Sequence, residues 1–388
     1  MDLLDLKDAA KQIALDSGAI LVGVGSRDRL VDAPPSGDMN YSLPGAQSCI
    51  IWAYPIPAET LDHYLGKTER LSYRNNMHFA YSTGWKSAAT VAQFIEKNTK
   101  YKAYPVMPNI DYRGTGFAFR QRLRVGRFFL RRGLATKLIA KIIARTFGEK
   151  VFPMFSLRYG AVAAGLGRLG WSGNLFVKDY GSAVYLAGAL TTAPLEPDPL
   201  ADENYCNKCK TCVQACPTGL FSLDEEEAPV TIAGREEIYA KRNAYARCYF
   251  GCGGLAGVGP GGSWSTWTPD HDCLKEVAEE QMNDPAYRAK LLQDMLSSNA
   301  TPVVQREFNK TILIQYMNGG ILGNIGKRTL EDTHPTCGAC QAVCVADPKQ
   351  RKKLLALLKS AGKMNLDEEG KEYIERPDGT TFYPPTEV

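Results

Sequence analysis

The chain has 388 residues and is 44% hydrophobic, so it is long enough for one large domain or two ordinary ones with a hydrophobic core. Its 46 basic and 42 acidic residues leave a formal net charge of +4, which excludes the strongly basic composition of general nucleic-acid binders. The N-terminal residues show neither an export signal nor a twin-arginine motif, and no run of about 18 apolar residues occurs. We therefore expect a cytoplasmic protein without transmembrane helices. In that reducing compartment the eleven cysteines are expected to be metal ligands rather than disulfides.

The first hundred residues alternate between helical and strand patterns. Apolar residues on one face predict a helix over 2–16 and another over 83–98. Short β-rich runs bounded by Gly, Pro and Ser predict strands over 18–26, 48–56 and 101–108. This mixture predicts an α+β fold rather than an all-helical or all-β one.

Residues 112–148 are rich in arginine, lysine and large apolar residues and contain no acidic residue. This pattern predicts a basic helical insertion of one or two amphipathic helices. One interpretation is a solvated surface helix with its apolar face on the core. The other is peripheral contact with an anionic membrane or an acidic partner.

Residues 151–200 alternate apolar runs with glycine-rich turns, which predicts strands packed against glycine turns. Glycine lets the backbone approach a large cofactor closely, so Gly165, Gly167, Gly170 and Gly173 are candidates for such a contact. The alternative is that they only form turns and bulges.

The rest of the chain divides around two cysteine segments. We expect a cofactor-binding core over 1–200, a ferredoxin-like two-cluster domain over 201–350 with a long insertion at 253–336, and a C-terminal helix and tail over 351–388. The insertion contains a Gly- and Trp-rich loop and then helical patterns. The last 25 residues are polar and predict a loose tail.

The first cysteine segment has the spacing of a ferredoxin. It reads Cys-x2-Cys-x2-Cys-x3-Cys-Pro, the pattern of [4Fe–4S] proteins, and its ligands are Cys206, Cys209, Cys212 and Cys216. Three thiolates two residues apart can bind three corners of one cluster, while the fourth, expected to start a helix, reaches the other cluster. Zinc is the alternative, but zinc sites usually need paired Cys-x-x-Cys units separated by a longer spacer.

The second segment, Cys337-x2-Cys340-x3-Cys344, lacks one cysteine for a complete second cluster. In two-cluster ferredoxins the fourth cysteine of a segment ligates the other cluster. Cys206, Cys209, Cys212 and Cys344 are therefore expected to bind cluster one. Cys216, Cys337 and Cys340 are expected to bind cluster two with one more thiolate, for which the candidates are Cys248, Cys252 and Cys273. Cys49 stands alone in an apolar strand and is expected to be a buried small side chain.

Several segments together resemble the cobalamin-dependent iron–sulfur reductases, which comprise the epoxyqueuosine reductases and the reductive dehalogenases. The resemblance lies in GAVAAGLGRLGWSGNLFV at 160–177, LAGALTTAPLEPD at 186–198, the first cysteine segment, YSTGWKSAATVAQFIEKNTKYKAYPVMPN at 81–109 and ARCYFG at 246–251. It covers roughly 45–110, 150–252 and 334–350.

The resemblance implies a nitroreductase-like α+β core with a corrinoid bound between it and the ferredoxin-like part. It implies that Gly165, Leu166, Gly167 and Gly170 bind this cofactor, that electrons pass from two [4Fe–4S] clusters to cobalt, and that Cys248 is the eighth ligand. It also implies that Tyr81 matches the tyrosine that protonates the substrate in the dehalogenases.

Two departures separate the chain from both named activities. The acidic residue that epoxyqueuosine reductases carry before the glycine motif is missing from KVFPMFSLR at 150–158. The arginine that dehalogenases carry after their Tyr-Gly is missing after Tyr180-Gly181.

We therefore expect a reductase of a small organic substrate, acting by dehalogenation or deoxygenation and supplied by an external electron donor such as ferredoxin or flavodoxin. No nucleic acid is expected apart from a tRNA substrate. The alternatives are a non-catalytic electron-transfer or corrinoid-handling protein and a flavin-containing iron–sulfur reductase. Tyr81 is the candidate proton donor, because a positioned phenol can serve as a general acid, and a buried core tyrosine is the alternative. His78, His271 with Asp272, and the pair Trp264 and Trp267 are further candidates for lining a pocket.

Overall fold

A computed structural model of the chain describes most of the N-terminal half and both cysteine segments. The described residues are 1–106, 155–222, 226–244, 247–248, 267, 273–284, 286–287, 337–369 and 371–385. The basic insertion predicted at 112–148 and nearly all of the insertion at 253–336 lie outside them, as do Trp264, His271 and Asp272. Among the described residues, no helix combines the length and apolarity needed to cross a bilayer.

A four-stranded antiparallel sheet forms the centre of the core. Its strands are β1 (Leu21–Ser26), β2 (Ser48–Pro55), β6 (Val184–Thr191) and β3 (Ala103–Val106), in the order β1-β2-β6-β3. Strand β2 pairs with β6 over its whole length, from Ser48 opposite Thr191 to Pro55 opposite Val184. The mixed α and β structure predicted from the sequence is confirmed.

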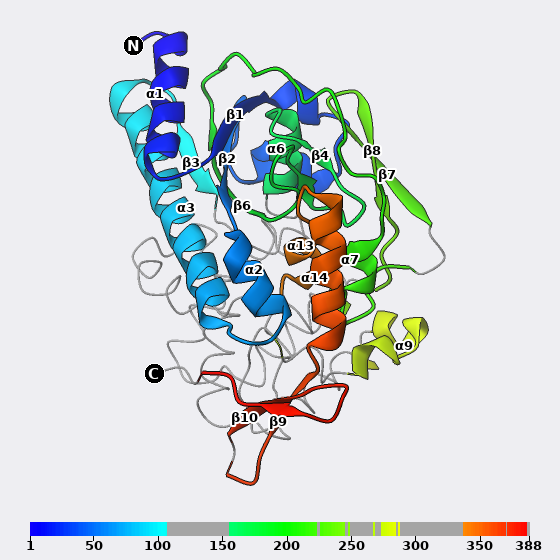
Figure 1. The fold of residues 1–388 in the computed structure, drawn as a ribbon. Helices are drawn as coiled ribbons and strands as arrows, with labels where there is room; N and C mark the ends of the chain where they lie inside the picture. The colour runs from blue at the N-terminus through cyan, green and yellow to red at the C-terminus, as the bar shows by residue number, and fades with distance from the viewer. Residues whose placement is uncertain are drawn as a thin grey trace, which may run out of the picture.

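Both faces of this sheet are buried, which explains why β2 is a continuous apolar run. Ile50, Trp52 and Tyr54 enter the cluster that also contains residues of α1 (Leu3–Asp16), α2 (Ala58–Leu65) and α3 (Leu71–Asn98). Cys49 and Ile51 enter the cluster on the opposite face, where α6 (Leu157–Ala163) packs. Figure 1 shows α1 and α3 along one side of the sheet and α6 on the other.

Helix α3 begins twelve residues before the helix predicted at 83–98. Its first turns, LSYRNNMHFAYS, are mostly polar, and their pattern alone did not indicate a helix. Tyr73 and Met77 are nonetheless buried against the core. The longer helix places His78 and Tyr81 on regular helical turns.

Two further predictions were wrong. The prediction of strands over 151–200 holds only for its second part: β4 (Arg168–Leu169), β5 (Leu175–Phe176) and β6 are strands, but residues 157–163 form helix α6. The expected loose tail instead contains a three-stranded antiparallel sheet of β9 (Lys363–Leu366), β10 (Glu372–Glu375) and β11 (Thr381–Phe382). Met364 and Ile374 of this sheet are fully buried, and this apolar contact orders a polar segment.

The remaining elements surround the cysteine segments or connect the strands. Helix α7 (Thr211–Gln214), the hairpin β7 (Glu227–Ile232) and β8 (Arg235–Ala240), and α9 (Glu279–Asn283) precede the second segment, which contains α13 (Ala339–Ala342) and leads into α14 (Pro348–Ser360). Short 3-10 helices lie at Arg27–Leu30, Pro35–Gly37, Met39–Tyr41 and Cys273–Lys275. In Figure 1, α7, α13 and α14 lie close together beside α2.

Asp198 joins helix α1 to the edge strand β1. Its carboxylate accepts from Lys7 Nζ at 2.7 Å, Lys11 Nζ at 2.8 Å and the Val24 amide at 2.9 Å. Partial burial acts to raise the pKa of Asp198, but the hydrogen bonds from Lys11, Lys7 and Val24 outweigh it and lower the pKa below 3.8. The ionised carboxylate therefore stabilises the fold.

Asp198→Asn is expected to lower the free energy of unfolding at neutral pH by about 1–2 kcal/mol, because it removes a charge-assisted, half-buried group. The stabilisation is complete above the unfolded pKa near 3.8 and is lost as the pH falls through the lower folded value. Urea unfolding at neutral and acidic pH measures this, and the difference between the two proteins should shrink in acid. Asp202→Asn is the control, because that side chain is 93% exposed. An equal loss in both variants would contradict the prediction.

Candidate functional site

The two cysteine segments have the same local structure. Lys210, which follows Cys209, and Gly338, which follows Cys337, both have a φ of 60° and both precede a four-residue helix. These helices, α7 and α13, contain the next cysteine of each segment and pack against each other. The fourth cysteine of the first segment does not start a helix as predicted, because Cys216 lies after the end of α7.

The structure brings Cys344 to the first three cysteines of the other segment. Burial chiefly raises the pKa of Cys212, and repulsion from the thiols of Cys344, Cys340, Cys206 and Cys209 raises it further. Burial also raises the pKa of Cys344, with a further contribution from Cys206. Cys206, Cys209, Cys212 and Cys344 are called set one below.

Cys216, Cys248, Cys337 and Cys340 form set two. Burial chiefly raises the pKa of Cys340, and the next contributions come from Cys216, Cys248 and Cys337. Cys340 also influences Cys212 of set one, so the two sets adjoin. Cys252 and the side chain of Cys273 lie outside the described residues.

Cys49 is separate from both sets and is fully buried in β2, as predicted. Burial is the main cause that raises its pKa to about 12.

Across the described ranges, no three His, Cys, Asp or Glu side chains converge to hold a metal ion. Sets one and two are therefore defined by the electrostatic influence of their thiols on one another.

The cysteine sulfur atoms are surrounded by hydrogen-bond donors. The Trp171 amide donates to Cys206 Sγ at 3.2 Å, the Leu220 amide to Cys216 Sγ at 3.3 Å and the Ala339 amide to Cys337 Sγ at 3.5 Å. Arg351 Nη1 lies 3.3 Å from Cys209 Sγ and Asn174 Nδ2 lies 3.8 Å from Cys340 Sγ. Amide donors of this kind stabilise thiolate ligands and tune iron–sulfur clusters, so the donor set fits such clusters.

Direct contacts connect set two to the core. The Tyr64 hydroxyl donates to the carbonyl oxygen of Cys337, and Gln341 Nε2 donates to the carbonyl oxygen of Val184. Set one is connected in the same way, because the Ser182 amide donates to the Cys344 carbonyl at 2.6 Å. The second segment is therefore attached to α2 at Cys337, to β6 at Gln341 and to the residues just before β6 at Cys344.

The glycine motif adjoins set one, and its glycines are required by contacts within the chain. A Cβ on Gly165, whose φ is +78°, would lie 2.0 Å from the Pro199 carbonyl oxygen. One on Gly167 would lie 2.2 Å from the Phe176 carbonyl oxygen. At Gly170 a Cβ would lie 3.7 Å from Cys206 Sγ, an ordinary contact. The missing side chains at Gly165 and Gly167 therefore point at the chain's own backbone, which agrees with the turn-and-bulge interpretation.

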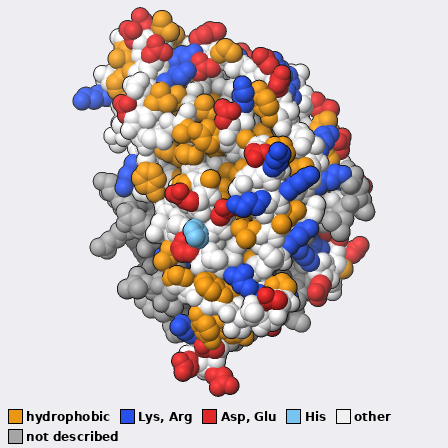
Figure 2. Space-filling model, viewed as in Figure 1, with side chains coloured by type: hydrophobic (Ala, Val, Ile, Leu, Met, Phe, Trp, Pro, Cys, Tyr) orange, Lys and Arg blue, Asp and Glu red, His pale blue; other side chains and the backbone are white. Residues whose placement is uncertain are grey.

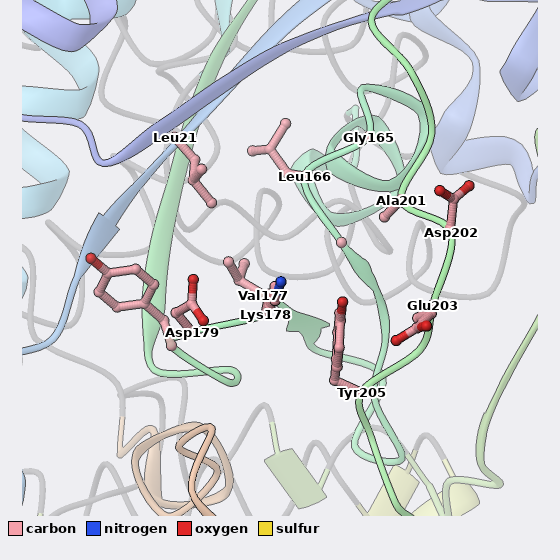
Figure 3. Close-up of a pocket in the computed structure, with 12 residues that line it drawn as sticks. Leu21, Gly165, Leu166, Val177, Lys178, Asp179, Ala201, Asp202, Glu203 and Tyr205 are labelled. Atoms are coloured by element: carbon pink, nitrogen blue, oxygen red, sulfur yellow. The ribbon is translucent and has the colours of Figure 1, made fainter.

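A cavity of about 400 Å³ lies along this motif. Figure 3 shows Leu21 and Leu166 at its apolar end, with Asp202 and Glu203 on the right side and Asp179 on the left. This volume is that of a pocket for an ordinary small molecule, so the described residues can enclose only part of a corrinoid. The apolar end suits a flat ring, whereas the carboxylates would repel a phosphate-bearing tail. The fit to a corrinoid is therefore partial.

A group of tyrosines lies between the core and Cys337. The rings of Tyr81 and Tyr185 meet edge to face with centroids 5.2 Å apart, and those of Tyr64 and Tyr73 stack at 3.9 Å. The hydroxyls of Tyr73 and Tyr185 are buried without a hydrogen-bond partner of regular geometry. Burial chiefly raises the pKa of both, followed by Tyr64 for Tyr73 and by Tyr73 for Tyr185. These two phenols are therefore protonated at neutral pH.

Sequence reasoning identified Tyr81 but missed Tyr64, Tyr73, Tyr185 and Arg351. Tyr64, Tyr185 and Arg351 lie on α2, β6 and α14, and the burial of these elements depends on tertiary contacts. Tyr73 had an available signal, because it lies eight residues before Tyr81 and so recurs on one helix face. Trp267, a predicted pocket residue, is buried in the core, where its indole nitrogen donates to the Tyr64 carbonyl at 3.0 Å.

Comparison with known proteins first defines the class. A family model described as "4Fe-4S binding domain" matches residues 199–222, so the chain contains an iron–sulfur domain. This agrees with the cysteine pattern of the first segment.

Among curated proteins, the chain is similar to epoxyqueuosine reductases, which confirms the resemblance inferred from the sequence. The protein of Synechococcus sp. (strain RCC307) is 27% identical over 232 residues, which cover 56% of this chain and 62% of that protein. The protein of Listeria monocytogenes is 46% identical over 59 residues, 15% of each chain. The chain therefore spans less than two thirds of the length of these relatives.

Solved structures show a distant likeness. A reductive dehalogenase is 17% identical with a TM-score of 0.40, covering 75% of this chain and 36% of that one. An epoxyqueuosine reductase bound to a modified tRNA stem loop is 16% identical with a TM-score of 0.38, covering 92% and 100%.

Proposed function

We propose that the chain is a cobalamin- and [4Fe–4S]-dependent reductase that removes a halide or an oxygen atom from an organic substrate. The observation that carries the proposal is the arrangement of eight cysteines in two adjoining sets, each drawn from both cysteine segments. Two clusters in such sets would be close enough for electrons to pass between them. The similarity to epoxyqueuosine reductases supports a catalytic role over that of a carrier.

The proposal divides the chain into three parts with different tasks. A nitroreductase-like core over 1–200 would bind the cofactor, residues 201–350 would form the two-cluster domain, and 351–388 would add helix α14 and the C-terminal sheet. Contacts of Tyr64, Ser182 and Val184 with the second cysteine segment support close association of the first two parts. Electrons would come from an external carrier such as ferredoxin or flavodoxin.

When bound, the corrinoid supplies a strong, low-potential reductant. Gly165, Leu166, Gly167 and Gly170 would contact part of it, with Leu166 offering an apolar surface. The chain itself must supply protons, because reductive removal of a substituent consumes them. Tyr81 is the proposed donor, and the protonated hydroxyls of Tyr73 and Tyr185 near it suit a proton-donating site.

The missing acid in KVFPMFSLR disfavours epoxyqueuosine itself as the substrate. The described part of that stretch is apolar or hydrogen-bonded, because Phe155 is buried and Ser156 caps helix α6. A small organic halide or oxygenated compound is therefore the preferred substrate class. A tRNA substrate remains an outcome of the test, and contact of 112–148 with a membrane stays a prediction.

The test is anaerobic reconstitution of the full chain with iron, sulfide and cobalamin, followed by metal analysis and absorption spectroscopy. We expect about eight irons and one retained cobalt per chain. Turnover with a chemical reductant is then compared between a halogenated phenol and an epoxyqueuosine-containing tRNA stem loop. Eight irons with bound flavin and no retained cobalt would overturn the corrinoid and support a flavin reductase. Eight irons with neither cofactor would indicate an electron-transfer protein.

A further inference from the structure

Arg351 of helix α14 is a buried guanidinium beside set one. The residue is only 2% exposed, although it lies in the basic sequence KQRKKLLALLKS. Its Nη1 donates to Asn207 Oδ1 at 2.8 Å and to Cys209 Sγ at 3.3 Å, and its Nη2 donates to the Ala346 carbonyl at 2.9 Å. Figure 2 shows other Lys and Arg side chains gathered on the face where α14 lies, but these are at the surface.

The charge of Arg351 is not neutralised by a carboxylate within the described residues. Its polar partners are an amide oxygen, a carbonyl oxygen and a thiol, and its guanidinium lies 5.5 Å from the Phe176 ring centroid. Its Nε is buried without a hydrogen-bond partner. A buried cation is costly unless an anion compensates it, so this site is suited to a negative charge at Cys209.

The donors described for three ligands of set two are neutral. Cys216, Cys337 and Cys340 accept from the amides of Leu220, Ala339 and Asn174. Cys209 of set one, by contrast, is in contact with a buried positive charge.

We propose that Arg351 is a positioning residue that raises the reduction potential of the cluster bound by set one. The inference rests on the proposed function, because it requires a cluster in each set. Reduction adds one electron from an external one-electron carrier and no proton, so the cluster and its ligands gain one negative charge. Arg351 stabilises that added charge. Hydrogen bonding and net charge at the sulfurs are known determinants of cluster potential.

The experiment is a redox titration of the reconstituted full chain, followed by electron paramagnetic resonance, for the parent protein, Arg351→Gln, Arg351→Lys and Lys353→Gln. We expect two one-electron waves in the parent. In Arg351→Gln one wave should move down by at least about 59 mV, which is a tenfold change in the ratio of reduced to oxidised cluster at a fixed potential, and the other wave should be unchanged. Arg351→Lys keeps the charge but loses the paired donors and should shift less. Lys353→Gln, an exposed change on the same helix, should shift neither wave.

Iron content separates the two ways of failing. A parent chain with about four irons would refute the two-cluster proposal itself. Eight irons with both waves unchanged in Arg351→Gln would overturn the role of Arg351 alone. If Arg351→Gln loses four irons, Arg351→Lys decides: one lowered wave supports the inference, and two unshifted waves overturn it.

Discussion

Replacing both Cys337 and Cys344 with alanine is expected to remove all of about eight irons, although the two residues belong to one short segment. The reason is that Cys344 lies with set one and Cys337 with set two, so the double change removes a ligand from each cluster. Each single change should remove about four irons. Iron analysis and absorption near the cluster charge-transfer band after anaerobic reconstitution provide the measurement.

A second double variant makes this test specific to the crossed arrangement. Cys344→Ala with Cys212→Ala removes two ligands of set one, so about four irons should remain, as in either single variant. Cys49→Ala is the control, because this thiol is buried in β2 away from both sets, and it should keep all eight irons. If Cys337 and Cys344 instead bound one cluster, their double variant would keep about four irons.

Replacing Tyr81 with phenylalanine is expected to lower turnover by about 10²- to 10⁴-fold, because it removes a general acid without changing the ring. The ring contact with Tyr185 should persist, so iron and cobalt contents should stay at the level of the parent protein. Turnover is measured with the substrate that the screen identifies, together with the solvent isotope effect. The isotope effect should change because another group must then deliver the proton.

The matched control is Tyr101→Phe, since Tyr101 also packs on the same hydrophobic cluster and is partly buried. It should leave turnover unchanged. Equal activity of Tyr81→Phe and the parent would show that Tyr81 is a core residue, which was the alternative interpretation of the sequence.

The iron–sulfur domain could be predicted from the first cysteine segment, because cluster binding imposes short local spacing. Cys206 to Cys216 lie within one loop and short helix, so their order along the chain already defines their possible contacts. The choice of Cys248 came from resemblance, since no local pattern connects it with Cys340. Its position beside set two depends on packing over a large separation in sequence.

The tyrosine group and Arg351 could not be predicted in the same way. Tyr64, Tyr73 and Tyr185 come from α2, α3 and β6, and only the folded sheet brings these elements together. Arg351 lies in a strongly basic helix whose composition indicates a solvated surface. Its burial follows from α14 packing against α7 and α2, which its own sequence does not specify.

The C-terminal sheet could not be predicted from its sequence for a different reason. Its strands are only two to four residues long, and β9 and β10 contain the fully buried Met364 and Ile374. Strands this short give no recognisable alternation of apolar and polar residues. The sheet is ordered partly by Lys67, whose buried ammonium group donates to the Gly362 carbonyl at 2.6 Å.

The crossing of the two cysteine segments also constrains how the protein matures in the cell. Neither segment contains a whole ligand set, so a nascent chain that has not yet emerged through Cys340 can complete neither set, and set one also needs Cys344. The clusters can therefore be inserted only near the end of synthesis, not while most of the chain is still being made. A chain interrupted by a premature stop or by proteolysis within the preceding insertion would leave the thiols of Cys206, Cys209, Cys212 and Cys216 without their partners. Such a fragment would expose a group of oxidisable thiols and would be a ready substrate for the proteases that remove incomplete chains.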